Sequence, residues 1–484
     1  MKHRFGTALT AVLLLAACGL ASCGEASAPT EKGNTPSAET AGETAAVTES
    51  ETEAKPASVV PDGLDFGGKT FMLLGGDAVF EVYTMATELS GDTLNDALFN
   101  RYQAVGDKLN VSFAFTPENS TGAVSKLTSS VLAGDDSYQL AIVQRATSIA
   151  KMVGDHLLHN WNDLPYVDLS TPYWFHDAIE SLRVGDLIYY TYGDIYPMST
   201  HVMYYNKAML DTFDLPSPHE YALNGTWTLD RLLEMASAVS KDLNGDGKMD
   251  ENDQYGISFG NTDMINSLMY GAGVTITEKN GDGVTLRPLD DRMLAAYEKI
   301  HQLFQNNTCY FKKLNTLTIA TGQVLFYTSS VHGARTYRDS TVEFGLLPYP
   351  KFDEAQEHYI SFLNTELMCV PSTADPELAG ACTQLLAENS GGVKEAYYEY
   401  LLKEKVARDP ESAQVLDLIF GNAINDFIIS YCGGMSKSSN MYNIPQTLAQ
   451  KGSTDFASSY EKNAEGVMKE IEKAYGMILS NTEG

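Results

Sequence analysis

A run of residues near the middle of the chain, from Asp242 to Asp253, has the composition and spacing of a calcium-binding loop. Side-chain oxygens stand at loop positions 1, 3, 5, 9 and 12, with glycine at position 6. This spacing lets alternate side chains and one backbone carbonyl converge on a hard cation. The expected ligands are Asp242, Asn244, Asp246, Lys248 through its carbonyl, Asp250 and Asp253. The loop predicts a structural calcium site, although Asp253 replaces the usual glutamate, and an ion-free Asx-rich turn stays the alternative.

The segment Gly256-Ile257-Ser258-Phe259-Gly260 has the Gly-x-Ser-x-Gly form of a hydrolase nucleophile elbow. An elbow needs a strand before the serine, a helix after it, and histidine and acidic partners. The calcium-type loop precedes this motif, and no histidine stands where it would be marked as the base. No pair of carboxylates stands out for glycoside hydrolysis either. We therefore expect Ser258 to be a strand residue and the chain not to be an enzyme.

Aromatic and polar side chains gather in one span of the chain. They are Trp174, Tyr192, Asp194, Tyr196, His201, Tyr204 and Trp227. A sugar site uses aromatic faces for the apolar side of the ring and a few amides, carboxylates or arginines for its hydroxyls. Core packing is the alternative for each residue, because the chain has 27 Tyr and 3 Trp. The cluster as a whole favours a carbohydrate ligand.

The amino terminus predicts export. The basic Lys2-His3-Arg4 precedes an apolar stretch, Ala8 to Leu20, that is too short to span a bilayer comfortably. The following Leu20-Ala21-Ser22-Cys23 resembles the lipobox of bacterial lipoproteins, in which the cysteine is diacylated and becomes the new amino terminus. Residues 1–22 are therefore expected to be a signal peptide and Cys23 a lipid anchor at the outer face of the membrane. Cys18 and an ordinary secretory signal remain alternatives.

Composition and length indicate how the rest of the chain is organised and which partners it is not expected to bind. Residues 23–62 are mostly Glu, Thr, Ala, Ser, Gly and Pro, which predicts a solvated linker. The formal charge of -30 repels phosphate backbones and argues against a nucleic-acid partner. A chain of 484 residues is long enough for two large lobes. The other four cysteines show no metal or redox spacing, and their pairing stays open.

Strands and helices are expected to alternate from Lys69 onward. The predicted strands are Lys69–Leu74, Val111–Phe115, Tyr138–Val143 and Val202–Tyr205, and a hairpin turns at Asn280–Gly283. The clearest predicted helices are Thr93–Leu109, Ser125–Leu132, Leu229–Val239, Ala396–Val406, Ser412–Leu418 and Tyr460–Leu479. This alternation predicts an α/β fold with helices on both faces of a parallel sheet.

Several spaced segments carry a family resemblance. They are Phe66 to Phe71, Gly91 to Ala97, Tyr205-Asn206-Lys207, Gly225 to Thr228, Asp242 to Gly256, Phe344 to Lys351, and Tyr397 through Asp417. Together they resemble the extracellular solute-binding proteins of family 1, the sugar-binding lipoproteins of ABC importers. The resemblance implies a two-lobed, periplasmic-binding-protein-like (type II-like) fold, each lobe a mainly parallel sheet flanked by helices, with a helix-rich C-terminus.

The resemblance also implies how the chain works. Lobe 1 would comprise residues 63–196 and 359–390, and lobe 2 residues 197–358 and 391–484. A monomer would capture a mono- or oligosaccharide in the interlobe cleft and deliver it to ABC permease subunits. The candidate ligand-binding residues are Gln144, Trp174, Asp194, Tyr204, Trp227, Arg335 and Glu366. A lipid-anchored extracellular hydrolase acting on carbohydrate, and a protein that presents ligand to a surface sensor, remain alternatives.

Overall fold

The computed structural model describes residues 56–75, 84–143, 149–196, 199–281, 283–337, 339–363, 366–401 and 410–480. The predictions for the signal peptide, Cys18, Cys23, most of the linker and Gln144 lie outside these residues. Residues from Pro56 onward belong to one compact unit. Within the part of the chain just specified, no helix is long and apolar enough to cross a bilayer.

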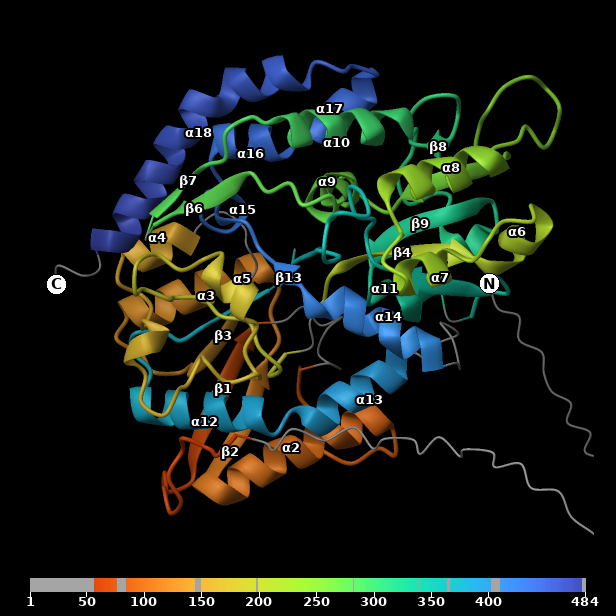
Figure 1. Cartoon of the computed structure of the whole chain (residues 1–484). Coiled ribbons are helices and arrows are strands. Elements are labelled where there is room, and N and C mark those ends of the chain that lie inside the picture. The colour runs from red at the N-terminus through yellow and green to blue at the C-terminus, as the bar shows by residue number, and fades with distance from the viewer. Residues whose placement is uncertain are drawn as a thin grey trace, which may run out of the picture. The chain divides into compact units, whose positions relative to one another are not determined.

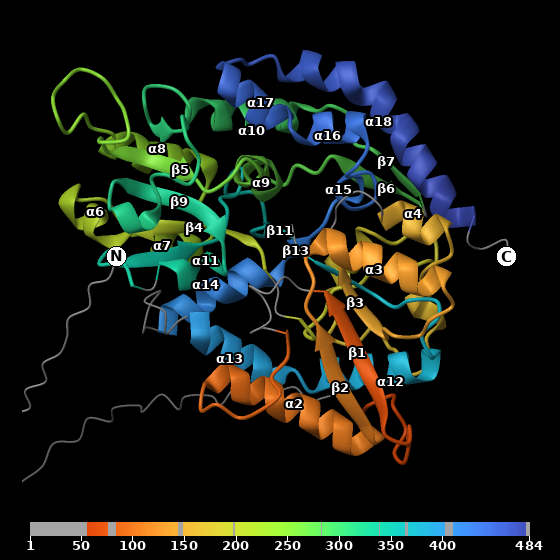
Figure 2. The ribbon, with the colours of Figure 1, turned by 180° about the vertical axis from the view of Figure 1, so that it is seen from behind.

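The first sheet contains four strands in the order β12-β3-β1-β2. They are β1 (Lys69–Gly75), β2 (Val111–Thr116), β3 (Leu140–Val143) and β12 (Leu367–Cys369). β1 runs parallel to β2 and β3 (Figure 2). β12 runs antiparallel to β3. The register places Lys69 opposite Val111 and Leu73 opposite Leu140. The expected parallel core is thus formed by β2, β1 and β3.

Helices pack on both faces of this sheet because its side chains alternate in direction. Leu74 and Val143 belong to the core that includes α3 (Ser120–Leu132), whereas Leu73 and Ile142 belong to the core that includes α2 (Thr93–Leu109) and α12 (Pro376–Glu388). Asp92 caps α2, since its carboxylate accepts the N–H groups of Leu94 and Asn95. α2 therefore begins and ends where the sequence predicts.

The second sheet has five strands in the order β10-β4-β9-β5-β8. They are β4 (His201–Asn206), β5 (Tyr255–Phe259), β8 (Cys309–Tyr310), β9 (Val324–Ser330) and β10 (Phe344–Leu347). β4 is antiparallel to β9 and β10, whereas β5 is parallel to β8 and β9, so the sheet is mixed. Ser258 lies inside β5, is 2% exposed and donates to the Leu317 carbonyl. It is a strand residue, as expected, and is not presented as a nucleophile.

Two small sheets complete the strands. β11 (Ser361–Phe362) pairs parallel with β13 (Ala423–Ile424). β6 (Thr277–Asn280) and β7 (Gly283–Leu286) form the expected hairpin. Its first strand starts at Thr277, which pairs with Leu286 and so sets the register.

The remaining helices surround these sheets (Figure 1). In the first part of the chain they are α4 (Ile149–Gly154), the 3₁₀ turn η1 (Trp161–Asp163), α5 (His176–Glu180), α6 (Lys207–Thr212), α7 (Pro218–Leu223), α8 (Leu229–Val239), α9 (Asp263–Gly271), α10 (Asp291–Gln302), η2 (Ile319–Thr321) and α11 (Gly333–Thr336). The C-terminal helices are α13 (Gly391–Leu401), α14 (Pro410–Gly421), α15 (Phe427–Tyr431), α16 (Ser436–Tyr442), α17 (Ile444–Lys451) and α18 (Phe456–Leu479). The helix-rich C-terminus is confirmed.

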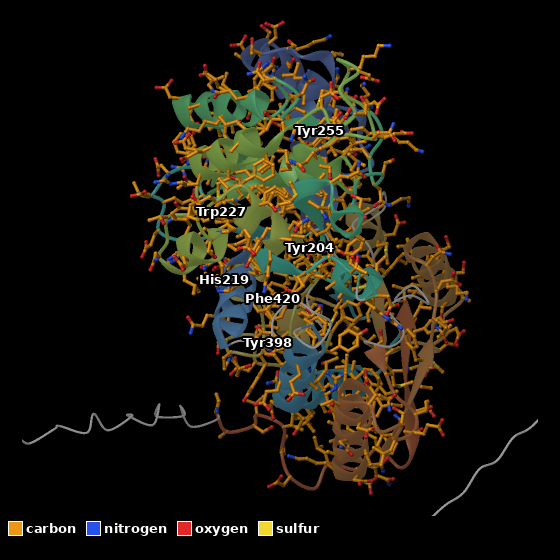
Figure 3. All side chains as sticks on the ribbon, turned by 90° about the vertical axis from the view of Figure 1, so that its right-hand side faces the viewer. Tyr204, His219, Trp227, Tyr255, Tyr398 and Phe420 are labelled. Atoms are coloured by element: carbon orange, nitrogen blue, oxygen red, sulfur yellow. The ribbon has the colours of Figure 1, made fainter. Side chains whose placement is uncertain are left out.

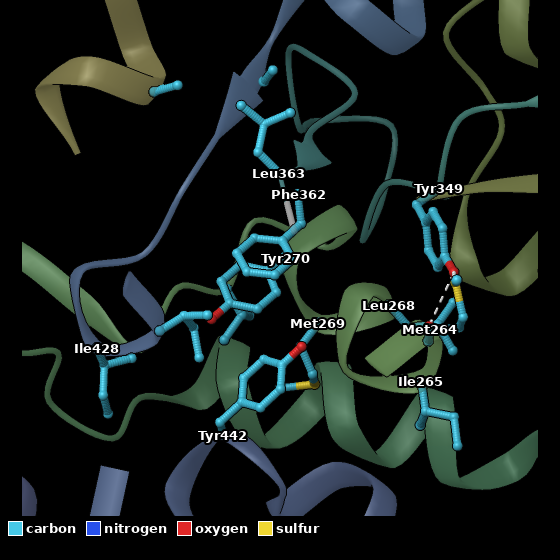
Figure 4. Packing of buried hydrophobic residues seen from close by; sticks show 14 of the residues in the cluster. Met264, Ile265, Leu268, Met269, Tyr270, Tyr349, Phe362, Leu363, Ile428 and Tyr442 are labelled. Carbon is cyan, nitrogen blue, oxygen red and sulfur yellow. Dashed lines mark hydrogen bonds between the residues drawn. The ribbon is translucent and has the colours of Figure 1, made fainter. Parts of the chain in front are cut away.

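Asp426 holds several of these elements together from a position that is 1% exposed. Its carboxylate accepts the Tyr270 hydroxyl at 3.2 Å, the Ile276 N–H at 2.7 Å and the Thr277 hydroxyl at 2.5 Å. It also accepts the N–H groups of Thr277 and Ile428. Burial raises the pKa of this carboxyl, while these donors oppose the rise. The Tyr270 ring stacks on Phe362 at 4.0 Å, within the core that Figure 4 shows.

Candidate functional site

A pocket of about 390 Å³ lies between two stretches of the chain that are far apart in sequence. One wall comes from residues 172–177 and Asp194, and the other from α13 and residues 420–423. Its aromatic lining includes Trp174, Tyr397, Tyr398 and Phe420, and its charged lining includes Asp177, Asp194 and Lys394. An apolar, aromatic hollow with a few polar groups is the usual form of a small-molecule site.

Trp174 is held rigidly in the first wall. Its indole N–H donates to Gln384 Oε1 at 3.3 Å, and Gln384 donates to Glu388 at 3.1 Å. The ring also meets Trp161 edge to face, with 5.5 Å between centroids. Trp174 is only 1% exposed, so it supports the pocket wall and offers ligand little free surface.

Gly193 allows the neighbouring segment to lie against this indole. A Cβ at position 193 would sit 2.7 Å from a Trp174 ring carbon and 2.9 Å from the Tyr173 carbonyl. Since real Cβ contacts are not so short, only glycine fits here. The close approach carries Asp194 to the edge of the pocket.

Asp194 presents a half-buried carboxylate to the pocket. Its backbone is fixed, because its N–H donates to the Tyr173 carbonyl at 2.9 Å. No side-chain hydrogen bond or ion pair to this carboxylate occurs among the described residues. Burial raises the pKa of Asp194 to about 6, and the positive charges of Lys394 and Arg101 oppose the rise. The group is thus an acceptor still able to bind ligand hydroxyls.

The second wall is formed by α13 and the end of α14. The buried face of α13, with Val393, Tyr397 and Leu401, belongs to the core that includes Leu98 of α2. This orientation turns Lys394 and Tyr398 toward the pocket. Tyr398 stacks on Phe420 with 5.5 Å between centroids and 25° between planes (Figure 3). Together the two rings form an aromatic stack in the pocket wall.

The structure brings only Trp174 and Asp194 of the predicted ligand-binding residues into this pocket. Tyr204 and Trp227 are fully buried and do not line this pocket. The Tyr204 hydroxyl donates to the Ser330 carbonyl at 2.7 Å. The Trp227 indole donates to the Pro348 carbonyl at 3.0 Å.

The other predicted residues lie elsewhere. Arg335 is exposed on α11, and Glu366, which is 9% exposed, precedes β12. Neither lines the pocket of Trp174 and Asp194. Gln144 is outside the described residues.

Sequence reasoning missed Lys394, Tyr398 and Phe420 as site residues. The adjacent Tyr397 and Tyr398 after a pair of glycines were a visible signal. Helical phase then decides which tyrosine faces the core: Tyr397 is 2% exposed, whereas Tyr398 is half-buried. Phe420 offered no comparable local signal.

The calcium-type loop lies between α8 and β5, where Lys241 and Gln254 form an antiparallel bridge. Its side chains accept backbone N–H groups: Asp242 accepts those of Gly245 and Gly247, and Asp253 accepts those of Leu243 and Asp250. Among the residues that the structure describes, no group of three or more His, Cys, Asp or Glu side chains is arranged to hold a metal ion. Calcium binding by this loop stays a prediction.

A family model for bacterial extracellular solute-binding proteins matches residues 97–390, more than half of the chain. The chain belongs to the bacterial extracellular solute-binding protein family. Members of this family are extracellular proteins that bind solutes, so this solute-binding protein acts outside the cytoplasm. No curated protein sequence matches it.

Solved structures share the fold of this solute-binding protein. A sugar transporter protein from Rhizobium etli, in an open conformation, is 14% identical, with a TM-score of 0.58 over 82% of this chain and 98% of that one. A solute-binding protein from Thermotoga lettingae, bound with α-D-tagatose, is 14% identical, with a TM-score of 0.51 over 84% and 100%. An ABC substrate-binding protein from Listeria monocytogenes, in complex with cycloalternan, is 12% identical, with a TM-score of 0.53 over 84% and 99%. The expected periplasmic-binding-protein-like fold is confirmed.

Proposed function

We propose that this solute-binding protein captures a mono- or oligosaccharide in the pocket of Trp174, Asp194, Tyr398 and Phe420 and delivers it to an ABC permease. The observation that carries the proposal is that the stacked rings of Tyr398 and Phe420 and the carboxylate of Asp194 line one hollow. A sugar offers a matching apolar ring face and hydroxyl donors. The structural relatives bound to tagatose and cycloalternan support a carbohydrate ligand.

The same proposal covers the setting of the protein. A diacyl group on Cys23 would hold it at the outer face of the membrane, with residues 23–62 as a linker, and it would act as a monomer. Lobe 1 would comprise residues 63–196 and 359–390, and lobe 2 residues 197–358 and 391–484. Asp194 and α13 would then approach the ligand from different lobes, as a hinged carrier requires.

We expect sugar binding without turnover. The exported chain with Cys23→Ser, which prevents acylation, is screened by thermal shift against D-tagatose, maltose, maltotriose, maltotetraose and cycloalternan. A ligand at one hundred times its dissociation constant adds about 2.7 kcal/mol of stability. Each stabilising sugar is then recovered and checked by mass spectrometry. Absence of any stabilising sugar contradicts the proposed ligand class, and a cleaved product contradicts a pure carrier.

Calcium is expected to stabilise the chain through the loop of Asp242. Extracellular calcium modules bind with dissociation constants of about 10⁻⁴–10⁻³ M. In 5 mM calcium the free energy of unfolding should therefore rise by roughly 1–2 kcal/mol over that in EGTA. The double variant Asp242→Ala, Asp246→Ala should lose this difference, whereas Asp291→Ala, at an exposed site on α10, should keep it. An equal calcium effect in both variants would place the ion elsewhere.

A further inference from the structure

Arg101 is a buried cation whose contacts reach both walls of the pocket. It lies on α2 and is 3% exposed. Its Nη1 donates to the Ile195 carbonyl at 2.9 Å and to the Ser390 hydroxyl at 2.9 Å. A longer contact of 3.4 Å reaches the Asp194 carbonyl. One guanidinium nitrogen thus joins α2 to two segments distant from each other in sequence.

Each of these two segments leads directly into the pocket. The first carries Asp194 itself. The second begins α13, since the Ser390 carbonyl accepts the Lys394 N–H at 2.9 Å one turn before Tyr398. Ser390 is fully buried and its hydroxyl also donates to the Leu386 carbonyl at 2.7 Å. The position of each wall therefore depends on the same side chain.

The guanidinium is not explained by packing alone. Its Nε and Nη2 make no hydrogen bond within the described residues. A buried cation with unused donors is destabilising unless a nearby anion offsets its charge. The central guanidinium carbon, Cζ, lies 4.8 Å from the centre of the Tyr102 ring, which provides a modest cation–π attraction. Asp194 is the nearby anion, since its carbonyl lies 3.4 Å from Nη1, and the positive charges of Lys394 and, to a smaller extent, Arg101 oppose the rise that burial causes in the pKa of its half-buried carboxyl.

We propose that Arg101 is a positioning residue for ligand capture: it holds the Asp194 segment and the start of α13 in place and puts a positive charge beside the Asp194 segment. The part that concerns capture rests on the proposed sugar-binding function. The charge role, an effect of Arg101 on the titration of Asp194, follows from the 3.4 Å contact between Arg101 Nη1 and the Asp194 carbonyl and is open to test without ligand.

The other charges around Asp194 define what a variant at Arg101 changes. They are Asp177 with His176 on α5, Tyr173 before it, Glu388 on α12, and Lys394 and Tyr398 on α13. None of these residues is itself changed when Arg101 is substituted. Comparison of Arg101→Gln with Arg101→Lys, which keeps the positive charge, therefore separates the loss of charge from a shift in their positions.

The first experiment follows the titration of Asp194 by NMR in protein labelled with ¹³C at the aspartate carboxyl, with Asp194→Asn to assign the signal. Wild type should titrate with a midpoint near pH 6, because the pKa of Asp194 is raised to about 6. Arg101→Gln removes the positive charge, so the midpoint should move up by roughly 0.5–1 pH unit. Arg231→Gln, at an exposed site on α8 paired with Glu234, should leave it unchanged. An unchanged midpoint in folded Arg101→Gln overturns the charge role.

The second experiment separates geometry from charge. Arg101→Lys keeps the charge but loses the forked contact to both segments. It should retain a midpoint close to wild type while amide hydrogen exchange in residues 194–196 and 391–401 becomes at least fivefold faster. Ser390→Ala, a milder loss of one contact, should accelerate exchange only at the start of α13. If amide exchange in both Arg101→Lys and Ser390→Ala is as slow as in wild type, the positioning role is overturned. This test does not require Arg101→Gln to fold.

The third experiment connects Arg101 to capture, using the five sugars named above as probes. If ionised Asp194 accepts ligand hydroxyls, affinity should fall roughly tenfold from pH 7.5 to pH 5, because a group with a pKa of about 6 is mostly protonated at pH 5. Arg101→Gln should shift this loss to higher pH, and Asp194→Asn should abolish it. Absence of binding by wild type at every pH rejects the sugar-binding function and leaves the titration result to decide the charge role. Binding with a pH profile unaltered in Arg101→Gln rejects the inference alone.

Discussion

Replacing Asp426 with alanine is expected to lower the free energy of unfolding by about 3–5 kcal/mol, because several donors lose their acceptor and each buried donor left unsatisfied costs about 1–3 kcal/mol. The donors left behind are the Tyr270 hydroxyl, the N–H groups of Ile276 and Ile428, and both donors of Thr277. Tyr270, Thr277 and Ile428 are buried, so their donors do not regain a partner easily. Urea unfolding followed by circular dichroism measures the change.

Two further variants show whether the network is the cause. Asp455→Ala, at an exposed position before α18, should change stability by less than about 0.5 kcal/mol. Asp426→Asn keeps the shape but places an amide donor among donors, so it should recover only a small part of the loss. A stability of Asp426→Ala close to wild type would show that water replaces the carboxylate.

Tyr398→Ala is expected to weaken sugar binding by about 2–4 kcal/mol, roughly 30-fold to 1,000-fold, the range for an aromatic residue at the centre of a binding site. The substitution removes the half-buried ring that stacks on Phe420 and so breaks up the aromatic stack of the pocket wall. Isothermal titration with the tightest-binding sugar of the panel measures the loss.

The matched control for Tyr398 lies on the same helix. Tyr400 is also half-buried, but it does not line the pocket. Tyr400→Ala should therefore reduce affinity by less than about threefold. Equal losses in the two variants would mean that α13 is merely destabilised, and an unaffected Tyr398→Ala would move the binding site away from this pocket.

Local signals were sufficient for the elements that end at capping residues. Asp92 and Asn110 delimit α2 as expected, and Thr228 caps α8, whose range of Leu229–Val239 also matches the prediction. The hairpin of β6 and β7 shows the limit of such signals. Its glycine-rich turn was recognised, but the extent of its first strand depends on cross-strand pairing, which spacing alone does not reveal.

Aromatic content was a weaker guide to the site. Tyr204 lies on the central β4, where every residue is buried, and its ring meets Tyr327, Tyr337 and Phe344. Trp227 packs against Phe326 in the same way. An aromatic residue in a strand covered on both faces serves the core, and the sequence does not show which faces are covered.

The sequence by itself determined the order of strands and helices, the α/β class and the family, because these depend on short-range periodicity, capping and spaced motifs. The tertiary structure alone decided the pocket, since Asp194 and Tyr398 are distant in the chain and meet only after α2, α13 and the segment after Gly193 pack together. Arg101 illustrates the physical reason. Nothing local distinguishes it from any other helical arginine, and its role arises from the carbonyl, hydroxyl and carboxylate groups that folding brings around it.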